Sequence, residues 1–167
     1  MGAPGGASSP ADEAPSSRPG GGAAASPVPA SHHDVLEEQY ATLATVGLNG
    51  RPQLSTVCFL ASADGIVRLS VNETRQKAKN MLADPKVSLH IADSAQPARY
   101  LELRGHASVQ ADDEYTFADV LGAKYGGLDL RKMDRPGERR TVVTIVVDRV
   151  RAVDMHRPGE IGSALGS

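Results

Sequence analysis

The sequence has one cysteine, little net charge and no long apolar run, and each of these properties excludes a class of protein. The single Cys58 allows no disulfide within the chain, which fits a reducing compartment. The net charge of −2 argues against general nucleic-acid binding, which usually requires a strong basic excess. No stretch approaches the roughly 20 apolar residues of a membrane span. We therefore expect a soluble, cytoplasmic protein.

The common signatures of catalytic and metal sites are also missing. There is no legible Ser/His/Asp arrangement and no Gly-rich phosphate loop with its lysine. His32 and His33 are adjacent but lack the accompanying ligand spacing of a metal site, so we predict no metal. Cys58 lies in an apolar stretch and is interpreted as a buried, unreactive thiol. His90 and His106 fall on different predicted strands and are interpreted as packing or surface residues, so the catalytic residues stay unassigned.

The composition divides the chain into a tail, a domain and a second tail. Gly, Pro, Ala and Ser make up 25 of residues 1–30, and Val28 is the only large aliphatic residue after Met1. Such a segment buries too little apolar surface to offset the entropy lost on ordering, so we predict disorder. It lacks the basic start and apolar region of a secretion signal. Residues 31–156 are predicted to form one domain, and residues 157–167 a flexible C-terminal tail.

Apolar periodicity in the domain predicts mainly β structure. Six strands are expected, near residues 40–46, 52–61, 66–71, 86–92, 98–110 and 139–155. Asn49-Gly50 and Asp64-Gly65 are hairpin signals, and Gly105 inside a strand indicates a bulge or bend. Short helices are expected after Ser31, after the third strand and within residues 111–127. Hairpin-linked strands with few helices predict a six-stranded antiparallel barrel with short flanking helices.

Two strands have apolar residues on both faces. In the strand 52–61, Leu54, Thr56, Cys58 and Leu60 share one face, and Ser55, Val57 and Phe59 share the other. We predict that this strand is covered on each side, by the core and by another subunit. The run 139–155 is β-branched and nearly continuous, so we expect it to be fully buried.

The stretch "LSVNETRQKAKNMLADPKVSLHI" places three cations, Arg75, Lys77 and Lys79, between two strands. They either coat a solvated helix or hold an anion. If Asn72 or Thr74 caps the helix, Arg75 lies at its start, where free N–H groups attract phosphate. Lys77 neighbours the predicted apolar stripe of Ala78, Met81 and Leu82, whereas Lys79 lies about 200° around the helix and is expected to face solvent.

Four short motifs at these spacings resemble the pyridoxamine 5′-phosphate oxidase-like split-barrel family, whose members bind FMN or coenzyme F420. The motifs are Asn49-Gly50-Arg51-Pro52, Arg75-Gln76-Lys77, Asn80-Met81 and Asp84-Pro85. The similarity extends from about Leu43 to Met155 and looks greatest to the actinobacterial branch that uses the deazaflavin F420. It implies an FMN-binding split-barrel fold and a homodimer whose cofactor clefts lie between the two barrels.

The resemblance also implies which residues bind the cofactor. Arg75 and Lys77 would bind the cofactor phosphate, assisted by Ser70. The region around the ring would be lined by Pro52, Gln53, Ser55 and Thr56. The family often has Asn at the position of Thr56, so this role departs from the usual pattern.

By the same resemblance, the expected function is that of an F420H2-dependent reductase acting on a small unsaturated or carbonyl-type substrate. Two alternatives stay open: an FMN-binding flavoprotein of the same fold, and a non-catalytic module that sequesters a flavin. A second basic cluster lies in the connector before the last strand: Arg131, Lys132, Arg135, Arg139 and Arg140. It is interpreted as a solvated loop or, alternatively, as a guide for the acidic tail of F420. The substrate and the proton donor are not assigned.

Overall fold

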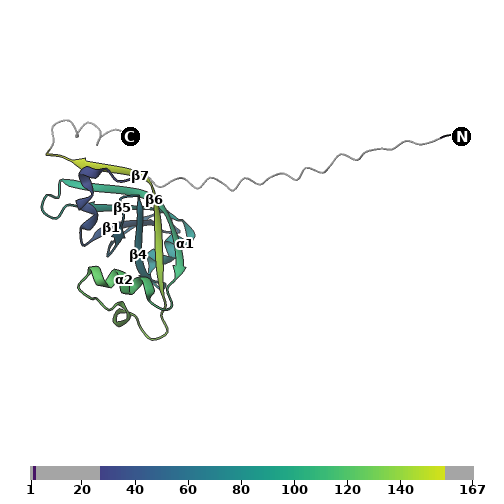
Figure 1. The fold of residues 1–167 in the computed structure, drawn as a ribbon. Coiled ribbons are helices and arrows are strands. Elements are labelled where there is room, and N and C mark those ends of the chain that lie inside the picture. Colours follow the sequence, from purple (N-terminus) through teal and green to yellow (C-terminus); the bar gives the residue numbers. More distant parts are fainter. Residues whose placement is uncertain (1, 3–26, 157–167) are drawn as a thin grey trace.

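A computed structural model describes Gly2 and residues 27–156. It contains one antiparallel sheet with the strand order β2-β1-β5-β6-β7-β4-β3. Figure 1 shows the long strands β6 and β7 side by side in this sheet. The strands are β1 (Ala41–Val46), β2 (Pro52–Val57), β3 (Leu60–Ala61), β4 (Ile66–Asn72), β5 (Lys86–Ala92), β6 (Arg99–Ala111) and β7 (Arg140–Asp154). The predicted mainly β, antiparallel split-barrel fold is confirmed.

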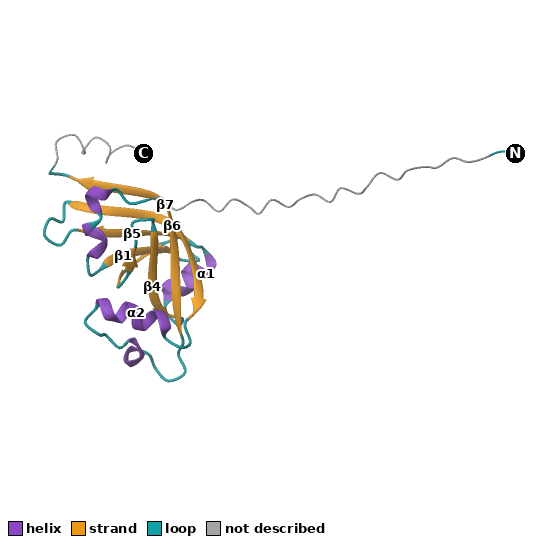
Figure 2. Ribbon diagram, viewed as in Figure 1, coloured by secondary structure: helices purple, strands orange, loops and turns teal. Residues whose placement is uncertain are grey.

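Short helices flank the sheet. Figure 2 shows α2 at the lower end of the sheet, near the end of β4. The helical elements are the 3-10 helices η1 (Ala30–His32), η2 (Asp34–Glu37) and η3 (Leu130–Met133) and the α-helices α1 (Gln76–Ala83) and α2 (Thr116–Lys124). None of these helices is long and apolar enough to cross a membrane.

The packed region begins before residue 31. Val28 is buried, and its N–H donates to the Ala63 carbonyl at 2.9 Å, so residues 28–30 belong with the domain rather than with the predicted tail. The rest of the two predicted tails, residues 1, 3–26 and 157–167, lies outside the described residues.

The predicted strand 52–61 is interrupted, which raises the number of strands from six to seven. Its first half, β2, pairs with β1, and its second half, β3, pairs with β4. β2 and β3 are the first and last strands of the sheet. Only Cys58 and Phe59 separate them in the sequence, so the two edges of the sheet lie close together at this link. At the break, the Tyr125 hydroxyl accepts the Phe59 N–H at 2.9 Å and donates to the Gln39 carbonyl. A side chain thus replaces a strand as the partner of Phe59.

The predicted bulge at Gly105 is confirmed. The pairing of β6 with β7 shifts register between Arg104 and Gly105, so that Asp148 is the extra residue opposite. A Cβ atom at position 105 would lie 2.2 Å from the Val146 carbonyl oxygen, closer than any real contact. The β6–β7 ladder therefore requires glycine at this position.

The core fills the inside of the barrel, and α1 closes one side of it. Ala78 and Met81 of α1 are buried against the sheet, as predicted. Leu82 was predicted to share this stripe, but it is 69% exposed, because an eight-residue helix lying across the barrel buries only a narrow face. The buried members of the sheet include Leu43, Leu69, Leu89, Ile91, Leu101, Leu103 and Ile145.

The predicted cover of β2 by another subunit stays a prediction, and the predicted full burial of the last strand is wrong. The outer face of β2 is exposed at Pro52, Leu54 and Thr56, with Leu54 67% exposed. In β7, Asp148 and Arg149 are exposed, because the bulge and the charged residues that follow it turn this part of the strand outward.

Candidate functional site

A cavity of about 220 Å³ lies between the end of β4, the start of α1 and the break between β2 and β3. Four residues predicted to bind the cofactor come together there, namely Thr56, Ser70, Arg75 and Lys77. The remaining lining residues are Val57, Cys58, Val71, Asn72, Leu121, Leu128, Leu130, Met133 and Arg140. Polar and cationic groups thus face a wall that is largely apolar, and we refer to this space as the anion cavity.

The cations of the anion cavity come from the start of α1. Arg75 is the N-cap residue in an extended conformation, and Lys77 lies in the first turn. Within residues 27–156 neither side chain forms an ion pair. Burial, followed by the nearby charge of Arg75, holds the pKa of Lys77 below its ordinary value. Two like charges without a carboxylate partner make an attractive site for an anion.

The start of α1 differs from the prediction in how it is capped. Neither Asn72 nor Thr74 is the N-cap, and Arg75 makes no side-chain capping bond. Instead, the Asn72 side-chain oxygen accepts from the Thr74 N–H at 2.9 Å and from its hydroxyl at 2.7 Å. This turn fixes the chain just before Arg75. Lys79 is exposed, as expected from its angle around the helix.

Arg140, interpreted from the sequence as part of a solvated loop, is buried beside the anion cavity. Its side chain is 6% exposed and pairs with Asp134 at 2.7 Å, and its Nη1 donates to the Ser70 hydroxyl at 3.4 Å. The signal in the sequence was its position: Arg140 directly precedes a β-branched run, so it begins β7 instead of ending a loop.

Two other cations of the connector are also paired with carboxylates. Arg131 contacts Asp119 at 2.5 Å, and Arg139 contacts Glu73 at 3.4 Å. Lys132 lies 3.9 Å from Asp129 and is well exposed, and Arg135 is exposed without an ion pair among the described residues. The connector is therefore partly neutralised.

Cys58 lines the anion cavity and is half-buried rather than fully buried. Burial raises the pKa of its thiol and outweighs the Tyr125 hydrogen bond and the charges of Lys124 and Lys77, which act to lower it. A thiol with a raised pKa stays protonated at neutral pH, so it is a weak nucleophile.

Three predicted cofactor residues lie outside the anion cavity. Gln53 is half-buried, and its side-chain oxygen accepts from Asn80 of α1 at 3.0 Å. The Ser55 hydroxyl is buried and has no hydrogen-bond partner among the described residues. Pro52 lines a different hollow of about 450 Å³ on the outer face of the sheet. Only part of the predicted set therefore converges within one chain.

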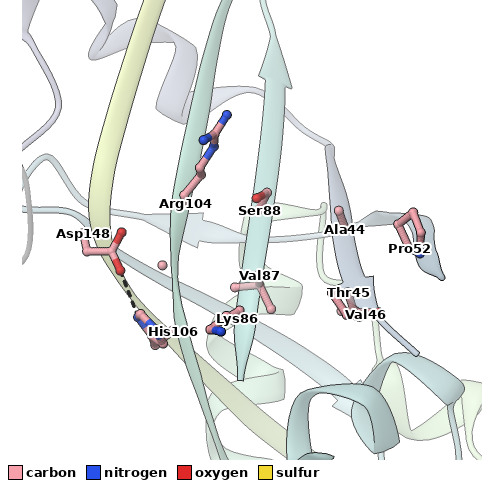
Figure 3. Close-up of a pocket in the computed structure, with 11 residues that line it drawn as sticks. Ala44, Thr45, Val46, Pro52, Lys86, Val87, Ser88, Arg104, His106 and Asp148 are labelled. Atoms are coloured by element: carbon pink, nitrogen blue, oxygen red, sulfur yellow. Dashed lines mark ion pairs between the residues drawn. The ribbon is translucent and has the colours of Figure 1, made fainter. Parts of the chain in front are cut away.

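Figure 3 shows this second hollow, with Pro52 on one side and side chains of β5, β6 and β7 on the other. Nδ1 of His106 lies 2.9 Å from an Asp148 carboxylate oxygen, with both side chains on the β6–β7 side of the hollow. Arg104 also lines the hollow and pairs with Glu102 at 2.7 Å. The lining of this hollow therefore includes a carboxylate, that of Asp148, whereas the lining of the anion cavity includes none. In the part of the chain that the structure describes, no three His, Cys, Asp or Glu side chains are grouped as metal ligands.

The fold defines a split-barrel protein, with a cavity lined by two cations at the start of α1. The sequence profile of the pyridoxamine 5′-phosphate oxidase family matches residues 29–154. The chain therefore belongs to this family of flavin- or deazaflavin-binding proteins.

Solved structures agree with this assignment. The chain is 28% identical to an F420 reductase, with a TM-score of 0.65, over 74% of this chain and 98% of that one. It is also 28% identical to a conserved hypothetical protein from Mycobacterium tuberculosis, with a TM-score of 0.63, over 84% and 91%. A putative pyridoxamine 5′-phosphate oxidase from Listeria innocua has 21% identity and a TM-score of 0.55, over 71% and 92%, and shares the fold. No curated protein sequence matched the chain.

Proposed function

We propose that this protein is an F420H2-dependent oxidoreductase that reduces a small unsaturated or carbonyl-type substrate. The observation that carries the proposal is the anion cavity, in which Ser70, Arg75 and Lys77 meet and the two cations have no carboxylate partner within residues 27–156. The similarity to an F420 reductase across nearly the whole of that protein supports the deazaflavin as the cofactor.

The residues of the cavity fit a phosphate. Arg75 can donate paired N–H bonds to phosphate oxygens, Lys77 adds a compact charge, and Ser70 adds a hydroxyl donor. Ser70 and Lys77 are half-buried, which strengthens their bonds relative to those of the exposed Arg75. The Ser55 hydroxyl on β2 is buried without a hydrogen-bond partner, so a cofactor ring could supply one. Pro52, Gln53 and Thr56 of the same strand would line the region around that ring.

Bound deazaflavin would supply the hydride chemistry. The chain itself would contribute binding and orientation. Arg75 and Lys77 would compensate the phosphate charge, and the buried Leu130 would present an apolar surface to the bound cofactor.

We also propose a homodimer with the cofactor cleft between its subunits. The outer face of β2 exposes Leu54 one pleat away from Thr56 of the anion cavity, so a second subunit that covers Leu54 would border the same cavity. Light scattering is expected to give a dimer, and Leu54→Glu is expected to give a monomer that binds cofactor more weakly. A wild-type protein that is monomeric at high concentration would refute this part of the proposal.

The cofactor is identified by adding F420 and FMN separately to purified protein and measuring fluorescence quenching. Tight binding of F420 with weak binding of FMN supports the proposal, whereas tight FMN binding with no response to F420 assigns the protein to the FMN-binding members of the family. Turnover is tested by following the oxidation of F420H2 with a panel of acceptors. Bound F420H2 that no acceptor oxidises would indicate a module that sequesters the cofactor.

A further inference from the structure

Behind the anion cavity, hydrogen bonds from three different parts of the fold converge on the carboxylate of Asp134. Arg140 at the start of β7 donates from Nε at 2.8 Å and from Nη2 at 2.7 Å. Asn72 at the end of β4 donates at 2.8 Å, and the Tyr115 hydroxyl, just before α2, donates at 3.0 Å. The side chains of Arg140 and Asp134 are only 6% and 3% exposed. One buried carboxylate thus joins three elements that surround the cavity.

The carboxylate of Asp134 is held in its charged form. Burial by itself would raise the pKa of Asp134, but the hydrogen bonds from Arg140, Asn72 and Tyr115 outweigh it and hold the pKa below its usual value. The group is therefore ionised at neutral pH, and the bidentate pair with Arg140 has the geometry of a strong, directional contact.

The first connection from Asp134 to the anion cavity runs through Arg140 to Ser70. With Nε and Nη2 bound to Asp134, the guanidinium is fixed in its plane, and its Nη1 donates to the Ser70 oxygen at 3.4 Å. Since this bond uses a lone pair of Ser70, the hydroxyl proton of Ser70 is left for another acceptor. Ser70 lines the cavity, so an anion there can accept that proton.

The second connection runs through Asn72 to Arg75. With its amide nitrogen on Asp134 and Glu138, Asn72 turns its oxygen to the N–H and hydroxyl of Thr74. The backbone carbonyl of Asn72 accepts a hydrogen bond from the Arg75 backbone N–H at 3.1 Å. The turn that carries Arg75 into the cavity is therefore anchored at Asp134.

We propose that Asp134 is a positioning residue for the anion cavity: by fixing Arg140 and Asn72, it orients the Ser70 hydroxyl and the turn that bears Arg75. The role of this cavity in binding the cofactor phosphate rests on the proposed function, but its capacity to bind an anion can be measured without any cofactor.

A simple electrostatic view predicts the opposite effect of Asp134. A carboxylate close to an anion site repels the ligand, so its removal should strengthen anion binding. If Asp134 acts by positioning, its removal weakens binding even though a negative charge is lost. The sign of the change therefore separates the two views.

The test compares sulfate binding by the wild type, Asp134→Asn and the control Asp129→Asn, followed by the amide signals of Ser70 and Lys77 in two-dimensional NMR. Asp129 lies on the same connector, its side chain is 38% exposed and its ion pairs are with Arg131 and Lys132, so its variant carries the same change of charge without the contacts of Asp134. We expect sulfate binding about tenfold weaker in Asp134→Asn and unchanged in Asp129→Asn. Equal or tighter binding by a folded Asp134→Asn variant overturns the proposal.

The pH dependence of sulfate binding is a second test, because a purely structural role of Asp134 would not make the affinity depend on its ionisation. The titration extends below the ordinary Asp pKa of about 3.9, because the pKa of Asp134 is lowered, and any protonation of sulfate itself is the same for the wild type and the variant. Asp134 has a lowered pKa, so its contacts persist above that pKa and are lost as the pH falls through it. The groups that face it are Arg140, Asn72 and Tyr115, with Glu138 bonded to the same Asn72. Wild-type affinity is expected to fall at acid pH, and Asp134→Asn is expected to lack that fall; the same acid limb in both proteins would contradict the proposal.

A second variant covers the case in which Asp134→Asn does not fold. Tyr115→Phe removes one hydrogen bond to Asp134 and no charge. Sulfate binding about two- to fivefold weaker supports the positioning role, and unchanged binding overturns it. The cofactor assay stays separate: if neither F420 nor FMN binds but sulfate binding depends on Asp134, the proposed function fails and the positioning role stands.

Discussion

Two segments of this chain are rich in cations, and the structure uses them differently. At the start of α1, Arg75 and Lys77 face the anion cavity without an ion pair within residues 27–156. In the connector before β7, the cations Arg131, Arg139 and Arg140 are each bound to a carboxylate. Three of the five connector cations are thus paired at short distance, whereas the cations at the start of α1 face a cavity whose lining contains no carboxylate.

The difference follows from where the acidic residues lie. No Asp or Glu occurs between Arg75 and Ala83, whereas Asp129, Asp134 and Glu138 are interspersed with the cations of the connector. Of the three paired connector cations, Arg140 has its partner, Asp134, in the connector itself. Arg131 pairs instead with Asp119 of α2, and Arg139 with Glu73, just before α1, so the fold also brings acids from other segments to the connector.

The largest effect is expected from breaking the buried pair of the connector. Asp134→Ala leaves the Arg140 guanidinium buried without its counter-ion, and we expect a loss of about 3–5 kcal/mol in the free energy of unfolding. Chemical denaturation of the wild type and the variant measures it. A loss well below this range would mean that Arg140 reaches water when Asp134 is removed, and that the pair is less rigid than the structure indicates.

The next effect concerns the α1 segment. Lys77→Ala is expected to weaken cofactor binding by about 1.5–3 kcal/mol, the range of a charge-assisted hydrogen bond. Lys79→Ala is the matched control, since Lys79 lies on the exposed side of the same helix and should change binding little. Fluorescence titration with F420 measures both. Equal losses from the two variants would refute the assignment of Lys77 to the cavity.

A smaller effect is expected from pH. Because the pKa of Lys77 is lowered, its ammonium loses its proton earlier than an ordinary lysine as the pH rises. Cofactor affinity should therefore be full below that pKa and decline above it, and Lys77→Arg should bind without this alkaline decline. Titrations between neutral and alkaline pH test this. An identical decline in both proteins would assign it to another group.

The smallest effect is expected at the exposed pair of the connector. Arg131 and Asp119 are both well exposed, so Asp119→Asn should leave the unfolding midpoint and cofactor affinity essentially unchanged. A clear loss of affinity would show that the connector contributes to binding through its surface charges, and the contrast between the two cationic segments would be weaker than we describe.

Local patterns predicted most of the fold. The hairpin signals, the proline after α1 and the alternation in β6 identified the strands and the helix between β4 and β5, because each depends on neighbouring residues. The break between β2 and β3 could not be predicted, since it depends on Tyr125, which lies 66 residues further along the chain from Phe59. The exposure of Leu82 was missed for a similar reason: periodicity gives the direction of a side chain but not what lies opposite it.

The candidate site was predictable in part. Ser70, Thr56, Arg75 and Lys77 come together as expected, because three of them lie within eight residues of one another around a single strand end. Arg140 and Asp134 were missed, since their importance comes from contacts between the connector, β4 and β7. Ser55, Gln53 and Pro52 do not line the same cavity in one chain, so their predicted role in binding depends on the cofactor and on a second subunit.

The Tyr125 hydroxyl at the barrel seam has a consequence for local opening of the fold. The Phe59 amide is protected by a phenol at the end of α2 and not by a neighbouring strand. Its exchange with deuterium should therefore report on the docking of that helix end, while the amides of β6 and β7 report on the sheet. This one amide could follow loosening of α2 in solution without any label on the helix itself.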